Sequence, residues 1–419
     1  MLSNQLELEG LYVMETYKRK LVTFVRGDGM RLYDATGKEY LDFLAGSAAV
    51  NAGHAHPLVT AAIKEQADKL LHVGNYFFIE GRGELAEMLS ALLNSVDGQT
   101  LGDPDSPTWK TFFANSGTEA VEGCLKLARR YGYRYLDGAG SIVSAKKSFH
   151  GRTYGSLTAT GQPSKQDIFK PLVPGFVSHV ELNDIAALEK ALDSETEAGK
   201  VAALLLEPIQ GESGVWPCTQ EYLQAARELT AERGQLLMLD EVQTGFYRTG
   251  TAFCFQGMGI IPDVVAMAKG LGNGMPIGAF AAHGNAATVL EAGDHGSTFG
   301  GSSLAVAVAL ASVRAYLQMN AGRKAIRVGT YLRSQLAELP GVLDIRGKGM
   351  MTGVTLSHPI ANQVVDAALA LAVKGGRPGF VLNATDAETL RFIPPLCCSE
   401  DEIDLLITAL QECLAMVAA

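Results

Sequence analysis

The sequence predicts an α/β protein whose larger part is a mainly parallel β-sheet covered by helices. Between about residues 60 and 315, short apolar runs alternate with helical patterns, as in repeated strand–helix units. At both ends this alternation stops: residues 21–43 hold β-prone runs between turn signals, and residues from about 318 onward mix helix and strand. We therefore expect a large domain at 61–317 and a smaller α+β domain built from an N-terminal segment at 1–60 and a C-terminal part at 318–419.

Five apolar runs are the candidate strands of the large sheet. They are followed by polar or glycine-rich residues, as strands that end at a sheet edge commonly are. The runs cover residues 111–114, 142–144, 201–206, 236–239 and 264–267. In the smaller part, the pairs Asp28-Gly29 and Thr36-Gly37 and the triplet Gly347-Lys348-Gly349 indicate turns.

Composition narrows the function classes. With 419 residues and 47% hydrophobic residues, the chain can bury a large core, and its net charge of −10 offers no field that attracts nucleic acid. No apolar run approaches the roughly 20 residues that cross a bilayer, and no secretory signal is visible, so we expect a cytoplasmic protein. The six cysteines and eight histidines lack metal-ligand spacing, and the glycine-rich stretches lack the pattern of a dinucleotide-binding motif or a P-loop.

Two charged residues each follow a candidate strand. Asp240 follows the run 236–239, and Lys269 closely follows the run 264–267. A parallel sheet collects its ligand chemistry beyond the carboxyl ends of its strands. An amine and a carboxylate placed there suit pyridoxal phosphate, because the lysine would form a Schiff base and the aspartate would keep the pyridine nitrogen protonated. Taken alone, a lysine after an apolar run is more often a solvated strand end.

A helix start follows the first candidate strand. Asn115-Ser116-Gly117-Thr118-Glu119-Ala120 opens an amphipathic pattern, and Ser116-x-x-Glu119 is the pattern of a capping box. The segment predicts a well-capped helix. It also fits a phosphate site, because Gly117 permits close approach and the N–H groups of Gly117 and Thr118 lie at the positive end of the helix dipole.

Several motifs in this order resemble the class III (ω) aminotransferases over nearly the whole chain. Besides Lys269, they are Asn115-Ser116-Gly117-Thr118-Glu119-Ala120, Phe149-His150-Gly151-Arg152-Thr153, Glu207-Pro208-Ile209-Gln210-Gly211-Glu212 and Asp240-Glu241-Val242-Gln243-Thr244-Gly245. The resemblance implies a homodimer with the fold type I architecture of pyridoxal-phosphate-dependent transferases. It also implies a seven-stranded, mainly parallel sheet in the large domain.

The resemblance assigns further roles toward the cofactor pyridoxal 5′-phosphate. Phe149 would stack on the cofactor ring and Val242 would pack against its other face, although an isolated phenylalanine is usually simple core. Gln243 would hydrogen-bond the ring hydroxyl oxygen. Thr298 would reach the cofactor phosphate of the neighbouring subunit, although a threonine in a Gly-rich turn is otherwise ordinary.

The resemblance also implies a set of substrate-binding residues. A guanidinium binds carboxylates in a bidentate way, and Arg152 would hold the α-carboxylate of the amine donor. Arg391 would pair with Glu207 until a dicarboxylic acceptor displaces that carboxylate, which indicates 2-oxoglutarate as acceptor. Ser297 is assigned to the same set. Glu212 would orient this region or act as a plain turn residue.

The donor is inferred from finer similarity. Ornithine aminotransferases carry a tyrosine at the position that Ser47 matches in this chain, and the stretches 381–384 and 390–392 look most like acetylornithine aminotransferases. The expected reaction converts N2-acetyl-L-ornithine and 2-oxoglutarate into N-acetyl-L-glutamate 5-semialdehyde and L-glutamate. Succinylornithine, succinyldiaminopimelate, ornithine and 4-aminobutyrate are alternative donors, and a non-catalytic binding protein is a remote alternative. Asn75-Tyr76-Phe77 would line the pocket or belong to an interface.

Overall fold

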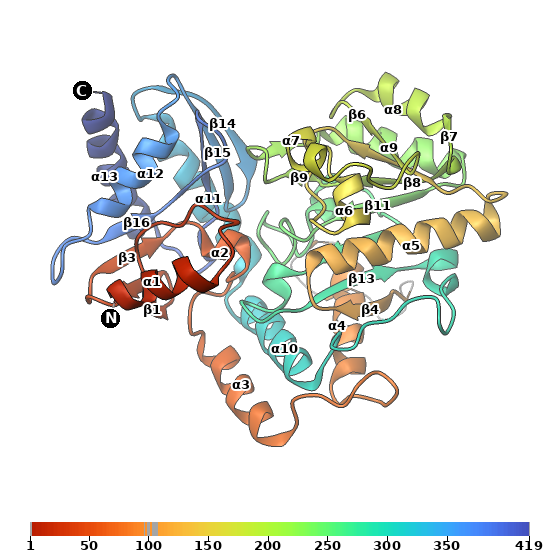
Figure 1. Cartoon of the computed structure of the whole chain (residues 1–419), viewed down its shortest axis with the longest axis horizontal. Coiled ribbons are helices and arrows are strands. Elements are labelled where there is room, and N and C mark those ends of the chain that lie inside the picture. The colour runs from red at the N-terminus through yellow and green to blue at the C-terminus, as the bar shows by residue number, and fades with distance from the viewer. Residues whose placement is uncertain (1, 96, 99–100, 103–107, 419) are drawn as a thin grey trace.

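The large sheet forms the centre of one half of the molecule (Figure 1). The computed structural model describes residues 2–95, 97–98, 101–102 and 108–418. Seven strands follow one another across the sheet, and all are parallel except β13, which is antiparallel to both neighbours. In spatial order they are β4 (Lys110–Ala114), β13 (Gly278–Ala282), β12 (Val264–Met267), β11 (Leu236–Asp240), β8 (Gly199–Leu206), β5 (Ser141–Ala145) and β6 (Val177–Val180). An additional short strand, β7 (Glu195–Thr196), pairs with β8 alone.

The five strands predicted from apolar runs are confirmed as β4, β5, β8, β11 and β12. The prediction omitted β6 and β13. β6 includes a serine and a histidine and is only partly buried. β13 consists of Gly, Ala and Phe, and glycine and alanine have low strand propensity. Its position between β12 and β4 is set by tertiary packing, which a short sequence window does not contain.

Helices cover both faces of the sheet, because successive strand residues point to opposite sides. Leu205 and Met238 pack in the apolar cluster that includes α5 (Gly117–Tyr135), whereas Leu204 and Leu237 pack in the cluster that includes α9 (Gln220–Glu232). The remaining helices of this half are α3 (Pro57–Lys69), α4 (Arg82–Leu93), α6 (Tyr154–Ala159), α7 (Pro163–Gln166), α8 (Ile185–Leu192) and α10 (Ser303–Gln318).

The start of α5 differs slightly from the predicted capping box. The Ser116 hydroxyl accepts a hydrogen bond from the Glu119 N–H at 3.3 Å, as predicted. The Glu119 carboxylate instead accepts from the backbone N–H and the side-chain amide of Asn115, at 2.7 and 2.8 Å. The cap therefore includes the residue before Ser116, which fixes the turn between β4 and α5.

Both chain ends contribute to the other half of the molecule (Figure 1). The antiparallel strands β1 (Phe24–Asp28), β2 (Arg31–Asp34) and β3 (Glu39–Asp42) are joined by the predicted turns, and β16 (Gly379–Val381) adds in parallel to β3. A second, antiparallel sheet has the order β14 (Val342–Lys348), β15 (Met351–Leu356), β18 (Thr389–Phe392), β17 (Asn383–Ala384). The helices here are α1 (Leu2–Tyr12), α11 (Ala321–Ala337), α12 (Ala361–Ala370) and α13 (Glu400–Ala418). The domain boundaries themselves stay a prediction.

Several short elements complete the chain. The short elements are α2 (Ala45–Ala48), β9 (Ile209–Gln210), β10 (Trp216–Pro217), η1 (Asp167–Phe169), η2 (Cys254–Met258), η3 (Lys269–Leu271) and η4 (Gly284–Thr288).

In the described part of the chain, no single helix is long and apolar enough to cross a bilayer. The pair α10 and α11, bent by 63°, meets that criterion by length and composition only.

The packing of α5 on β13 predicts the effect of a single methyl group. A Cβ at Gly123 would lie 2.1 Å from Phe280 Cε1, and the Phe280 ring is buried. Gly123→Ala should therefore lower stability by about 1–3 kcal/mol through overpacking. Gly10→Ala is the matched control, because Gly10 is also helical and a Cβ there meets nothing within 4 Å. Thermal unfolding should show a lower Tm for G123A only; equal midpoints would contradict this packing.

Candidate functional site

A cavity of about 400 Å³ lies at the carboxyl ends of β11 and β12. The register pairs Asp240 with Ala266, so that Lys269, three residues further along, lies just beyond the neighbouring strand. Eleven of the residues given a role from the sequence line this cavity. They are Ser116, Gly117, Thr118, Phe149, Arg152, Glu207, Glu212, Asp240, Val242, Gln243 and Lys269.

The N-terminus of α5 forms one end of the cavity. A Cβ at Gly117 would lie only 2.7 Å from Val242 Cγ1, so a glycine is required where the backbone passes this side chain. The Thr118 hydroxyl lies 2.6 Å from the Ser156 hydroxyl and accepts the backbone N–H of Arg152 at 3.3 Å. The first N–H groups of a helix have no acceptor within the helix, so this end can hold an anion such as a phosphate.

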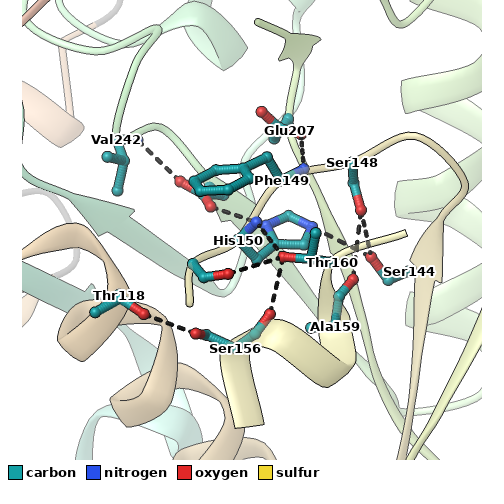
Figure 2. A network of polar contacts seen from close by, with 12 residues as sticks. Thr118, Ser144, Ser148, Phe149, His150, Ser156, Ala159, Thr160, Glu207 and Val242 are labelled. Carbon is teal, nitrogen blue, oxygen red and sulfur yellow. Dashed lines mark hydrogen bonds and ion pairs between the residues drawn. The ribbon is translucent and has the colours of Figure 1, made fainter. Parts of the chain in front are cut away.

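Asp240 is held by the buried His150, which is labelled in Figure 2 and to which the sequence motifs assigned no role. His150 Nδ1 lies 2.8 Å from Asp240 Oδ2, and its Nε2 lies 3.2 Å from the Ser144 hydroxyl. Asp240 Oδ1 accepts the backbone N–H of Val242 at 3.1 Å. An ionised carboxylate only accepts, so His150 Nδ1 carries the proton and donates to it. These bonds fix the Asp240 carboxylate at the base of the cavity.

Lys269 has an unusual backbone and an unusual acidity. Its φ of 43° is left-handed, and its side chain is half-buried at the cavity. Burial lowers the pKa of its amine to about 8, and the positive charge of Arg391 acts in the same direction. The carboxylates of Glu212, Asp240 and Glu207 oppose that shift. A substantial fraction of the amine is therefore neutral near physiological pH, as a nucleophile or a general base requires.

A slot between Phe149 and Val242 suits a flat ring. Both side chains line the cavity. The backbone N–H of Phe149 donates to Glu207 Oε2 at 2.8 Å (Figure 2). Gln243 is buried, and its side-chain oxygen has no partner in the described part of the chain. An unpartnered buried polar atom indicates a hydrogen-bonding group supplied by a ligand or water.

Arg391 pairs with Glu212 and not with Glu207, so the predicted pairing is wrong. Arg391 Nη1 donates to Glu212 Oε2 at 3.2 Å and to the Gly211 carbonyl at 2.8 Å, and its Nε donates to Asn383 Oδ1 at 3.0 Å. Glu207 lies directly after β8, beside the backbone of Phe149, where burial and the charge of Asp240 raise its pKa well above the usual range. Five residues later, the chain has turned beyond β9 and brings Glu212 to Arg391.

Ser297 and Thr298 do not line this cavity. Ser297 Oγ accepts from the Asn115 side-chain amide and from the Gly300 N–H, both at 3.0 Å. Asn75 donates to the Ser297 carbonyl at 2.7 Å, and Thr298 is exposed on the turn that these bonds hold. This turn borders a separate cavity, and the Tyr76 side chain is 99% exposed. Thr298 therefore does not reach the cavity that contains Lys269.

Near the N-terminal segment, Ala49 lines the cavity and Ser47 does not. Ser47 has a left-handed φ of 62° in the distorted helix α2. The backbone twist of this segment makes it hard to read from sequence which residue faces the site. Both residues are small, so neither supplies an aromatic hydroxyl to the cavity.

A family model and curated relatives match almost the whole chain. The model of the class-III aminotransferase family matches residues 12–414. An acetylornithine aminotransferase from Caldanaerobacter subterraneus subsp. tengcongensis is 42% identical over 98% of this chain and 98% of its own length. One from Gloeobacter violaceus is 44% identical over 96% of this chain and 95% of its own length.

Solved structures share the fold over the full length. The ornithine aminotransferase from Toxoplasma gondii, in which pyridoxal phosphate partially occupies the active site, aligns with a TM-score of 0.89 and 29% identity. The alignment covers 100% of this chain and 95% of that one. The acetylornithine aminotransferase from Elizabethkingia anophelis aligns with a TM-score of 0.84 and 31% identity, covering 99% of both chains.

The charges around Lys269 predict how its amine titrates when Arg391 is replaced. Arg391→Met removes a positive charge that lowers the pKa of Lys269, so that pKa should rise. Amine-labelling rates of Lys269 in the ligand-free protein, followed by peptide mass spectrometry across pH, measure this shift. The exposed Lys190 in the same digest is the internal reference. An unchanged or lower midpoint for Lys269 in R391M would refute the electrostatic coupling.

Proposed function

The chain belongs to the class-III aminotransferase family, and we propose that it transfers the δ-amino group of N2-acetyl-L-ornithine to 2-oxoglutarate. The products are N-acetyl-L-glutamate 5-semialdehyde and L-glutamate, a reaction of arginine biosynthesis. The observation that carries the proposal is the meeting of Lys269, the fixed Asp240 carboxylate and the N-terminus of α5 in one cavity. That set supplies an amine, a carboxylate and an anion site.

The cofactor is pyridoxal 5′-phosphate, and the residues present fit it. The N-terminus of α5 with Gly117 suits the phosphate, and the slot between Phe149 and Val242 suits the ring. Asp240 would hold the ring nitrogen, and the unpartnered side-chain oxygen of Gln243 would accept a hydrogen bond from the ring hydroxyl. When bound, the cofactor with its protonated ring withdraws electrons from the substrate carbon, so that a proton can leave it.

Lys269 would hold the cofactor and move the proton. Its lowered pKa makes the neutral amine available near physiological pH. With the cofactor bound, Nζ would take a proton from the δ-carbon of the donor and release it later in the same half-reaction. His150 donates to Asp240 and keeps that carboxylate aligned throughout.

Arg391 and Glu212 let one pocket accept two substrates. With the donor bound, the pair stays closed, and no substrate carboxylate is needed at Arg391. With 2-oxoglutarate bound, the α-carboxylate replaces that of Glu212 on the guanidinium, so the charge of Arg391 remains paired. The Gly211 carbonyl and Asn383 hold Arg391 in both cases, whereas the Glu212 side chain is 40% exposed and free to leave.

The donor is inferred from Arg152 and from the carboxylates around the cavity. Arg152 is exposed at the cavity, 5.5 Å from the Phe149 ring centroid, where it can bind the α-carboxylate. Among the described lining residues, Glu207, Glu212 and Asp240 already accept hydrogen bonds from Phe149, Arg391 and His150. A free α-ammonium would have to share a carboxylate that already accepts one of these hydrogen bonds, which favours an N-acylated donor. The curated relatives at 42–44% identity are acetylornithine aminotransferases.

The active unit that we propose is a cytoplasmic homodimer. Thr298 is exposed on the turn held by Asn75 and Ser297, outside the cavity of its own chain. In a dimer this turn would place Thr298 at the cofactor phosphate of the partner. Exposed aromatic side chains nearby, Tyr76 and Phe78, would be covered by the second copy.

A donor panel with 2-oxoglutarate tests the proposed reaction. N2-acetyl-L-ornithine should give a kcat/KM at least about tenfold above that of free ornithine, N-succinylornithine or 4-aminobutyrate, a difference of about 1.4 kcal/mol in transition-state binding. Lys269→Ala is the control and should abolish turnover of every donor. Preferred turnover of ornithine would favour the activity of the Toxoplasma gondii neighbour instead, and turnover by K269A would refute the site.

A further inference from the structure

The turn that carries Lys269 has an unfavourable backbone conformation. The φ of Lys269 is 43°, in the left-handed region that residues other than glycine seldom adopt. Two backbone bonds close the turn: the Leu271 N–H donates to the Ala268 carbonyl at 2.8 Å, and the Gly272 N–H donates to the Lys269 carbonyl at 3.0 Å. A left-handed residue persists where surrounding contacts impose its conformation. The contacts of this turn therefore decide where the Lys269 amine lies.

On one side, the turn rests against the segment that contains Asn51. A Cβ at Gly270 would lie 2.6 Å from Asn51 Nδ2 and 3.0 Å from Phe246 Cβ, so the backbone at Gly270 has no room to move in that direction. Asn51 is itself fixed. Its Nδ2 donates to the Phe246 carbonyl at 3.2 Å, and its Oδ1 accepts from Arg248 Nη2 at 2.5 Å.

Tyr316, in α10, holds the carbonyl of Gly270. Its hydroxyl donates to that oxygen at 2.6 Å, whereas the Asn273 N–H reaches the same oxygen only at 3.4 Å. Tyr316 is fully buried, and its ring centroid lies 6.3 Å from those of both Phe246 and Tyr247. The side chain does not line the cavity. Its position is thus set by the core, and its one polar atom is directed at the turn of Lys269.

We propose that Tyr316 is a positioning residue for Lys269: through the Gly270 carbonyl, it holds the left-handed turn that places the lysine amine in the cavity beside Asp240. The inference rests on the proposed function, because the position of the amine matters only if Lys269 is the reacting lysine. Without the hydroxyl, the Gly270 carbonyl loses its shortest hydrogen bond. The turn can then relax, and the amine moves away from its place at the cavity.

The first test follows the Lys269 amine in the ligand-free protein. Tyr316→Phe removes the hydroxyl and keeps the ring with its packing. Burial is the largest cause that lowers the pKa of this amine, so an amine that leaves its place should titrate higher, by about half a pH unit or more. Amine-labelling rates across pH, followed by peptide mass spectrometry, measure the midpoint. The charged groups that act on the amine are the same in both proteins: Arg391, Glu212, Asp240 and Glu207.

The second test measures the two half-reactions of the holoenzyme in single turnovers. The rate constants with N-acetylornithine and with 2-oxoglutarate should each fall about two- to tenfold in Y316F, the range that one hydrogen bond commonly contributes. Binding of both substrates should not change, because their carboxylates are held by Arg152 and Arg391. Tyr222→Phe is the matched control: Tyr222 is fully buried in α9, and its hydroxyl has no partner in the described part of the chain. Y222F should behave as wild type in both tests.

The proposal requires both changes in Y316F. A midpoint or a pair of rate constants equal to wild type would overturn it. Equal changes in Y222F would also overturn it, because they would show a general loosening of the core. A loss confined to one half-reaction or to substrate binding would assign Tyr316 to a substrate instead. Failure of the proposed function is distinguishable: wild-type enzyme would then not use N-acetylornithine, whereas labelling of the ligand-free protein would still report on Tyr316.

Discussion

The site depends on the parallel pairing of β11 with β12. This register sets Asp240 beside Ala266 and brings the chain to Lys269 three residues later. A shift by one residue would turn the side chains of either strand to the opposite face. The side chains of both strands pack alternately in the two apolar clusters that lie on the two faces of the sheet. The strand pairing that packs the core therefore also positions Asp240 and Lys269 at the site.

Around that pair, the charges of the site are arranged so that each carboxylate has a definite donor. His150 donates a hydrogen bond to Asp240, the Phe149 N–H donates to Glu207, and Arg391 donates to Glu212. Only the last of these bonds is reached by solvent, since the Glu212 side chain is 40% exposed. The bond that must exchange is thus the accessible one, and the bonds that must persist are buried. The same charges leave Lys269 with a pKa of about 8.

The sequence predicted the elements whose signal is local. The runs that became β8 and β11 are continuously apolar, and Asp240 and Lys269 stand out because charged residues follow buried strands. β13 was missed because its alanines and glycine resemble no strand. The Ser116 cap was predicted because capping depends on residues three positions apart.

Features that depend on the path of the chain in three dimensions could not be predicted in this way. Glu207 and Glu212 occur in one motif, and only the turn beyond β9 decides which of them meets Arg391. His150 directly follows Phe149, yet its contact with Asp240 spans 90 positions. Ser297 borders a different cavity from the one that contains Lys269, and the role that we propose for the neighbouring Thr298 lies between two copies of the chain.

The central claim is that Lys269 is the residue to which pyridoxal phosphate attaches. Borohydride reduction of the purified enzyme, followed by proteolysis and peptide mass spectrometry, tests it directly, because reduction makes the linkage permanent. The account predicts a single pyridoxyl phosphate adduct on the peptide that contains Lys269. An adduct on another lysine, such as Lys165, or the absence of any adduct in protein saturated with the cofactor would contradict it.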